Sequence, residues 1–490
     1  MTVTALGTDY EAVIGLETHV ELGTVSKMFC ACPTAFGAEP NTQVCPVCLG
    51  LPGALPVVNE TAIALTVRIG LALNCEIAPW CRFARKNYFY PDMPKDFQIS
   101  QYDEPLCVGG YLDVEVNGEK HRVGITRVHM EEDTGKSLHV GGGDGRIHGA
   151  THSLLDYNRA GVPLVEIVTE PDIRSAEVAA AYVTELRELL RALGVSEVRM
   201  EQGQLRCDAN VSLRVRGTEA FGTRTETKNL NSIRSVERAI LHEIGRQAGR
   251  LDAGERIVQE TRHFDEARGI TQAGRTKEEA TDYRYFPEPD LLPVALEKSY
   301  IDEIRDALPE LPAARRARLC QHFGFSPLEL EQMMGAGVLD LVEDTIAAGG
   351  EPDSARAWWL NEIARSASER GVEPGRLPLT GVDVARVIEL VSAGTLTNAL
   401  ARQVLAGVLD GEGSPDQVME ARGLAVVEDA DALAAACDAA IADAPEIAQK
   451  VRDGKAAAVG PLVGAVMKAM KGSADAAKVR AALLERLGAG

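Results

Sequence analysis

The stretch VIGLETHVEL, residues 13–22, decides the fold class because it alternates as a β-strand does. Successive side chains of an extended chain point to opposite sides, so its isoleucine, valine and leucine side chains share one face. That apolar face predicts a core strand. The other face carries Glu17, His19 and Glu21. For this strand alone, two interpretations are open: a solvated sheet face, or one wall of a polar site.

Two further segments alternate in the same way. QLRCDANVSLRV, residues 204–215, places Asp208 and Asn210 on its polar side, and FGTRTETK places Glu226 and Lys228 on its polar side. Neighbouring strands that carry acids, bases and amides on one face predict a polar wall, although a solvated face has the same pattern.

Hairpin and helix signals complete an α+β pattern in the first 300 residues. Asn117-Gly118, between two alternating runs, predicts a two-residue hairpin turn. SAEVAAAYVTELRELLRALG predicts an amphipathic helix that Ser175 caps and Gly194 ends. From about residue 300 the pattern is helical. We therefore expect an α+β fold: an N-terminal domain built on a largely antiparallel sheet, followed by an all-helical region.

Carboxylates converge from several of the expected strands. If the alternation before HMEEDTGKS continues through it, Glu132 shares a face with apolar residues, and a carboxylate there must be paired, metal-bound or protonated. DYNRAGVPLVEIVTEPD adds Glu166. Such oxygen-rich sites suit Mg²⁺ that carries a nucleotide's phosphates. Glu17 and His19 lie about 6.6 Å apart along their strand, so both could reach one ion, whereas Glu21 is the weaker candidate.

A phosphate site is predicted at the start of another helix. KNLNSIRSVERAILHEI predicts a helix that begins near Asn231 or Ser232, directly after Lys228 and its neighbours. A lysine beside the free N–H groups of a helix N-terminus is suited to bind phosphate. The sequence has no GxxxxGK[ST] loop, so this site would not be a P-loop.

Four of the ten cysteines cluster near the N-terminus as two close pairs: Cys30 with Cys32, and Cys45 with Cys48. Two such pairs separated by a loop suit a tetrahedral four-thiolate zinc site. With no open coordination position implied, the zinc would be structural. Four unrelated thiols are the alternative.

The charge balance limits the partners. The 490 residues include 51 Lys and Arg against 72 Asp and Glu, a net charge of −21. This disfavours non-specific nucleic-acid binding, so we expect no DNA partner, although a local basic patch can hold a structured RNA. Residues 451–490 offer such a patch, with seven Lys or Arg against three Asp or Glu, or else an ordinary solvated helix surface. We find no leader segment and no bilayer-spanning apolar run, so we expect a cytoplasmic protein without a membrane partner.

Taken together, the longer motifs resemble the GatB family, the B subunits of the tRNA-dependent Asp/Glu amidotransferases, from about Tyr10 to the C-terminus. The segments that carry the resemblance are VIGLETHVEL, SKMFC, RKNYFYPDMPKDFQISQYD, HMEEDTGKS, DYNRAGVPLVEIVTEPDIRS, LRCDANVSLR, KNLNSIRSVERAI and DYRYFPEPDL. GKAAAVGPLVGAVMKAMKG resembles the YqeY-like helical tail of that family.

The resemblance implies a cradle-shaped catalytic domain at 1–298, a helical domain at 299–412 and a tRNA-contacting tail at 413–490. It also implies the reaction. ATP phosphorylates the side-chain carboxylate of a Glu or Asp misacylated onto tRNA(Gln) or tRNA(Asn), and ammonia displaces the phosphate to form the amide. The residues fit this chemistry, because an acidic wall with Mg²⁺ and a phosphate-binding lysine is what phosphoryl transfer needs.

The resemblance also implies site residues. The Mg²⁺ ligands would be Glu17, His19, Glu132 and Glu226, with Glu131 and Glu166 as second choices. The catalytic carboxylates would be Glu132, Glu166 and Asp208. The residues that bind ATP would be Lys86, Arg159, Asn210, Lys228 and Asn231.

The source of ammonia is missing from this chain, because no amidase or Cys-His glutaminase signature appears. The resemblance implies a heterotrimer in which an amidase (A) subunit, stabilised by a small C subunit, supplies ammonia through an internal channel. Two alternatives remain open on the residues alone. A free-standing ligase that amidates a small carboxylic acid would hydrolyse ATP without tRNA, and a non-catalytic zinc and tRNA-binding module would not hydrolyse ATP at all.

Overall fold

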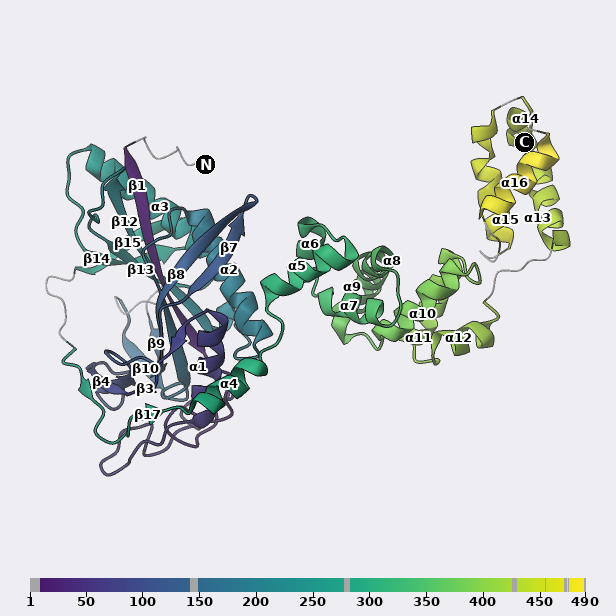
Figure 1. Cartoon of the computed structure of the whole chain (residues 1–490). Helices are drawn as coiled ribbons and strands as arrows, with labels where there is room; N and C mark the ends of the chain where they lie inside the picture. The colour runs from purple at the N-terminus through teal and green to yellow at the C-terminus, as the bar shows by residue number, and fades with distance from the viewer. Residues whose placement is uncertain are drawn as a thin grey trace. The chain divides into compact units, whose positions relative to one another are not determined.

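The computed structural model describes residues 9–141, 149–276, 283–424, 430–453, 455–470, 474 and 476–488. The chain divides into two compact units, Met1–Arg315 and Arg316–Gly490. The first combines a large sheet with helices, and the described part of the second is helical (Figure 1). The α+β fold class predicted from the sequence is therefore confirmed.

The first unit is built on a ten-stranded sheet. Its strands are β1 (Tyr10–Glu21), β2 (Glu76–Ile77), β6 (Cys107–Val108), β7 (Tyr111–Val116), β8 (Glu119–Glu132), β11 (Pro163–Thr169), β12 (Leu205–Val215), β13 (Thr225–Leu230), β14 (Glu260–Asp265) and β15 (Ile270–Thr276). Their order is β15-β14-β13-β12-β1-β11-β8-β6-β2, and β7 also pairs with β8. Strands β13 and β14 run parallel, and the other ladders described in this sheet are antiparallel.

Three small sheets complete the strands of this unit. The strand β4 (Ala84–Asn87) lies between β5 (Phe97–Ser100) and β16 (Phe286–Pro287). The others are the pair β9 (Lys136–Val140) with β10 (His152–Asp156), and the pair β3 (Trp80–Cys81) with β17 (Val294–Ala295). The sheet that contains β4 brings residues about 200 positions apart in the sequence together.

Helices α1 (Glu60–Ala72), α2 (Ala176–Ala192) and α3 (Ile233–Asp252) share one hydrophobic core with the apolar side of the large sheet. As expected, the Ser175 side chain caps α2 by accepting from the Val178 N–H, and Gly194 follows α2 with a φ of 65°. The short segments η1 (Met200–Gln202) and α4 (Lys298–Asp306) complete the helices of this unit before α5. The helices therefore leave the polar side of β1 for other contacts.

The predicted hairpin turn joins β7 to β8. Asn117 and Gly118 have φ angles of 54° and 81°, which is the pair of positive values that a type I′ turn requires. This turn fixes the register of β8, the strand that later supplies two adjacent glutamates to opposite faces of the sheet.

The second unit contains two helical cores among its described residues. Its elements are α5 (Pro312–Phe323), α6 (Pro327–Gly335), α7 (Leu339–Ala347), α8 (Pro352–Ala357), η2 (Trp358–Ile363), α9 (Ala364–Arg370), η3 (Pro374–Arg376), α10 (Gly381–Ser392), α11 (Asn398–Leu409), α12 (Pro415–Arg422), α13 (Ala430–Asp443), α14 (Pro445–Arg452), η4 (Ala456–Val459), α15 (Gly460–Ala469) and α16 (Ala476–Leu487). One core runs from Leu319 to Leu424 and the other from Cys437 to Leu487. No helix within the described ranges is both long and apolar enough to cross a membrane.

Candidate active site

The polar residues of β1 lie on the side of the sheet opposite the hydrophobic core. Glu17 pairs in register with Asp208 of β12, and His19 pairs with Glu166 of β11. Directly opposed residues of neighbouring strands point to the same face. The polar wall expected from the sequence is therefore continuous across three adjacent strands.

The carboxylates of this wall gather in two groups. One contains His19, Glu131 and Glu166, the other contains Glu17, Asp208 and Glu226, and within each group the possible ligand atoms lie within 4.8 Å of one another. The expected arrangement in which Glu17 and His19 share one ion is not the one observed, because the two side chains belong to different groups. Their spacing along β1 brings each nearer to a neighbouring strand than to the other.

His129 completes the first group, although its sequence position had not marked it as a candidate. It is 3% exposed, and its Nε2 lies 3.1 Å from Glu166 Oε2. Burial alone would raise the pKa of Glu166, but the charges of His129 and His19 and the hydrogen bond from His129 lower it. The signal was present in the sequence, because His129 alternates with Glu131 and so falls on the same face of β8.

Lys228 neutralises part of the second group. Its Nζ lies 3.0 Å from Asp208 Oδ2 and 2.9 Å from Glu226 Oε1. Burial opposes the charged form, but these two carboxylates dominate and raise the pKa of Lys228. Asn229 adopts a φ of 58°, and its backbone N–H donates to Asp208 Oδ1 at 2.8 Å. The lysine predicted to bind phosphate thus lies against carboxylates in this structure.

Glu17 carries excess negative charge around it. Burial, followed by the charges of Glu166, Glu226 and Asp208, raises its pKa, and Lys228 only partly offsets this. The Asn210 side-chain amide donates to Glu17 Oε1 at 3.0 Å. The predicted neighbours of Glu17 are therefore present, and the site favours an added cation or a proton at this carboxylate.

A cavity of about 450 Å³ opens onto both groups. Its lining includes His19, Glu131, Asp208 and Lys228 together with Lys86, Arg159, Arg206, Tyr88 and Tyr283. Lys86 Nζ lies 4.9 Å from the centre of the Tyr283 ring. Arg159 is held by the backbone carbonyls of Thr134 and Gly135, each at 3.0 Å. The volume is within the range of small-molecule sites, roughly 300–1,000 Å³.

Arg206 and Asp133 form a further pair at this cavity that the sequence patterns did not reveal. Arg206 Nη2 lies 2.8 Å from Asp133 Oδ2, and Arg159 Nε lies 3.6 Å from the same oxygen. Glu21 belongs to this edge rather than to either carboxylate group. Burial and the adjacent Asp133 raise the pKa of Glu21 to about 8.

Two expected site residues lie apart from this cavity lining. Asn231 is exposed directly before Ser232, whose hydroxyl caps α3 by accepting from the Ser235 N–H. Glu132 lies on the core-facing side of β8, as the alternation predicted, and it is paired as its burial requires. It forms an ion pair with Lys95 and accepts from the Ile99 N–H at 2.9 Å. The structure therefore does not bring Glu132 together with Glu17, His19 or Glu226.

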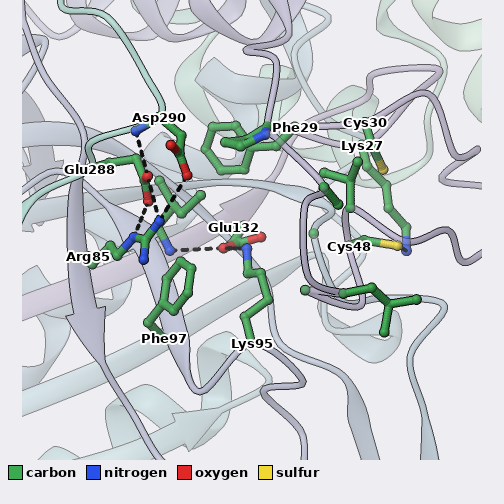
Figure 2. Close-up of a pocket in the computed structure, with 17 residues that line it drawn as sticks. Lys27, Phe29, Cys30, Cys48, Arg85, Lys95, Phe97, Glu132, Glu288 and Asp290 are labelled. Atoms are coloured by element: carbon green, nitrogen blue, oxygen red, sulfur yellow. Dashed lines mark hydrogen bonds and ion pairs between the residues drawn. The ribbon is translucent and has the colours of Figure 1, made fainter.

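Glu132 instead lines a smaller cavity of about 200 Å³ beside the cysteines (Figure 2). Across this cavity Arg85 donates to Glu288 Oε1 and Oε2 at 2.9 and 2.7 Å. The thiols of Cys30, Cys32, Cys45 and Cys48 lie within 4.8 Å of one another. The Lys27 side chain is buried here, with Nζ 3.7 Å from Cys48 Sγ and 3.2 Å from the Tyr157 carbonyl oxygen. The predicted clustering of the four cysteines is present.

Comparison with known proteins decides the family. Residues 12–302 match the GatB/GatE catalytic domain, and residues 340–487 match the GatB domain. The B subunit of the aspartyl/glutamyl-tRNA(Asn/Gln) amidotransferase of Frankia casuarinae is 72% identical over 484 residues, which cover 98% of this chain and 96% of that protein. The chain belongs to the GatB family.

Other members of the GatB family are similar over the same extent. The corresponding protein of Thermobifida fusca is 64% identical over 487 residues, covering 98% of this chain and 94% of that protein. The Streptomyces coelicolor protein is 63% identical over 484 residues, covering 98% of this chain and 96% of its own length. The family resemblance predicted from the sequence motifs is confirmed.

Proposed function

We propose that this chain carries out the ATP-dependent amidation of Glu-tRNA(Gln), Asp-tRNA(Asn) or both, as a ligase component of a tRNA amidotransferase. The observation that supports this most strongly is the cavity in which two carboxylate groups meet Lys86, Lys228, Arg159 and Arg206. Fixed charges of both signs in one cavity are the arrangement that phosphoryl transfer requires.

The chemistry assigns a task to each kind of side chain. The γ-phosphoryl group passes from ATP to the substrate's side-chain carboxylate, giving ADP and an acyl phosphate. Ammonia then attacks the carbonyl carbon, the C–O bond to phosphate breaks, and the attacking nitrogen loses a proton to form the amide. Lys228, Lys86 and Arg159 would stabilise phosphate charge. Glu17, whose pKa is raised, is suited to accept the proton.

The two carboxylate groups fit Mg²⁺. Hard oxygen ligands predominate in both, and the like charges around Glu17 leave it in need of a cation. We assign ion binding to Glu17, Asp208 and Glu226 in one group, and to His19, Glu131 and Glu166 in the other. When bound, Mg²⁺ would neutralise negative charge on the transferred phosphoryl group. The Mg²⁺ and catalytic roles expected for Glu132, and nucleotide binding by Asn210 and Asn231, stay predictions.

The four cysteines fit a structural zinc ion. Four thiolates with no oxygen or water position are the usual donor set of closed zinc sites. Such a site carries a net charge of about −2, and the buried Lys27 ammonium beside Cys48 offsets part of it. The ion would hold the loop between β1 and α1 in place.

The remaining proposals concern partners. The names of the relatives support assembly with an amidase (A) subunit and a small C subunit in a heterotrimer, with ammonia supplied by the former. The C-terminal helices, α13 to α16, would contact the tRNA. Location in the cytoplasm follows from these partners. The domain boundaries at 298 and 412 stay predictions.

The test is ATP hydrolysis by the purified heterotrimer with ammonium, with and without Glu-tRNA(Gln). We expect hydrolysis to require the misacylated tRNA, with uncharged tRNA(Gln) as the matched control, and to yield Gln-tRNA(Gln). Hydrolysis at full rate without tRNA would favour the free-standing ligase instead. No hydrolysis under any condition would favour the non-catalytic module.

A further inference from the structure

Five of the ten tyrosines lie around Lys86, next to the polar cavity. Tyr88 and Tyr283 line the cavity. Tyr90, Tyr102 and Tyr285 lie beyond them, each in ring contact with another of the five. The proposed catalytic steps use none of these rings.

The rings form two series that lead away from the cavity. In one, Tyr283 meets Tyr285 edge to face at 6.1 Å, and Tyr285 stacks on Tyr102 at 4.2 Å with ring planes 11° apart. In the other, Tyr88 stacks on Tyr90 at 5.5 Å with planes 14° apart. Each series begins at the cavity wall and ends at an exposed ring.

The outer rings are too exposed to serve a core. Tyr102 is 60% exposed and Tyr90 is 40% exposed, whereas Tyr182 in the hydrophobic core is fully buried. The chain is also fixed beneath the rings, because the Asn87 side-chain amide donates to the carbonyl oxygens of Tyr283 and Arg284 at 3.1 and 2.7 Å. Exposed aromatic faces on a fixed backbone are a preorganised surface for flat ligands.

The proposed substrate supplies such a ligand. A misacylated tRNA carries its amino acid on the ribose of the last nucleotide, at the end of an unpaired 3′ strand. For the amino-acid carboxylate to reach Lys228 and the carboxylate groups, the last bases must pass the cavity mouth. Unpaired bases stack on aromatic side chains without requiring one base identity. A surface of this kind therefore accepts the acceptor ends of both candidate tRNAs.

We propose that the tyrosine series ending at Tyr102 and Tyr90 is a stacking platform for the unpaired 3′-terminal bases of the substrate tRNA. This rests on the proposed function, because it places part of that substrate. Lys86, beside Tyr283 and within the charge field of Glu131 and Glu166, joins the platform to the reacting groups.

The test compares Tyr102→Leu, which removes the ring, with Tyr102→Phe, which keeps it, in the intact heterotrimer. We expect the leucine variant to raise the KM for Glu-tRNA(Gln) about tenfold, with the KM for ATP unchanged and the phenylalanine variant close to wild type. Thermal unfolding checks that both variants fold, which the exposure of Tyr102 favours.

A second readout does not depend on turnover. Uncharged tRNA(Gln) with 2-aminopurine as its terminal base should lose fluorescence when it binds the wild type or Tyr102→Phe, and lose less when it binds Tyr102→Leu. Equal quenching by all three proteins, with equal KM values for tRNA, would overturn the proposal. A rise in the KM for ATP alone would also overturn it and would place the adenine of ATP on the rings.

These outcomes are separate from a failure of the proposed function. If the wild-type heterotrimer shows no tRNA-dependent ATP hydrolysis, the proposed function fails, and the fluorescence comparison still decides whether the rings stack an RNA base.

Discussion

Glu131 and Glu132 are adjacent in β8 and almost equally buried, at 4% and 2% exposed, yet they lie in opposite electrostatic settings. Glu132 faces the cysteine side, where Lys95 and the Ile99 N–H satisfy its charge. Glu131 faces the polar cavity, where its neighbours are His19 and the carboxylate of Glu166. The side with paired charges is built for stability, and the side with surplus carboxylates is built to receive cations and substrate.

The largest expected effect comes from removing a cation on the cavity side. Lys228→Ala should reduce tRNA-dependent ATP hydrolysis by roughly 10² to 10³ in a folded protein, because it removes a charge that would stabilise the transferred phosphoryl group. Steady-state ATP hydrolysis by the heterotrimer measures this. Lys228→Arg, which keeps a cation, should retain more of the rate. Full activity in Lys228→Ala would show that its only role is to neutralise Asp208 and Glu226.

On the cysteine side the effect should be on stability. Glu132→Gln leaves the Lys95 side chain, 7% exposed, without a charged partner, and such a loss costs about 3 kcal/mol. The thermal unfolding midpoint of the complex should fall by several degrees. The double variant Lys95→Met with Glu132→Gln should recover most of this loss.

The neighbouring residue provides the matched control. Glu131→Gln should leave the midpoint unchanged or raise it, because it removes a negative charge beside Glu166. If Glu131→Gln and Glu132→Gln lower the midpoint equally, the two sides of β8 do not differ in electrostatic setting.

A smaller effect is expected at the cysteines. Lys27→Met removes the ammonium beside Cys48 and should weaken zinc binding about tenfold, as loss of a supporting contact to a ligand does. Competition with a chromophoric chelator measures the affinity. Lys27→Arg keeps the charge and should lie closer to wild type. Unchanged affinity in Lys27→Met would show that its charge does not act on the thiolates.

The smallest effect concerns pH. The folded protein raises the pKa of Glu21 to about 8, so it holds this proton more tightly than the unfolded chain does. Stability from this group is present below its unfolded pKa and is lost as the pH rises through about 8. Glu21→Gln lacks this loss. Its unfolding free energy relative to wild type should therefore increase by on the order of 1 kcal/mol between pH 5 and 8, as measured by urea denaturation.

Much of the fold followed from local rules. The alternation of β1 and β12, the Asn117-Gly118 turn and the Ser175 cap each depend on neighbours in sequence, and each is present as expected. The polar wall followed too, because side-chain alternation fixes which residues share a face.

The grouping of residues within the wall could not be predicted in the same way. Which carboxylate meets which depends on the register between strands, and that register paired Glu17 with Asp208 and His19 with Glu166. Lys95 meets Glu132 across 37 positions of sequence, through the placement of β5 beside β8. No local pattern indicates such a contact. The pairing of Asp133 with Arg206 was missed for the same reason.

Whether the polar wall is the kinase site is decided by two substitutions on the same face of β1. In the heterotrimer with ammonium and Glu-tRNA(Gln), Glu17→Gln should reduce ATP hydrolysis at least about 100-fold, because the glutamine can neither hold a cation nor accept a proton. Glu21→Gln should retain most of the rate, because glutamine resembles the protonated form that Glu21 holds at neutral pH. Equal rates in the two variants, or full activity in Glu17→Gln, would contradict the assignment of this wall to phosphoryl transfer.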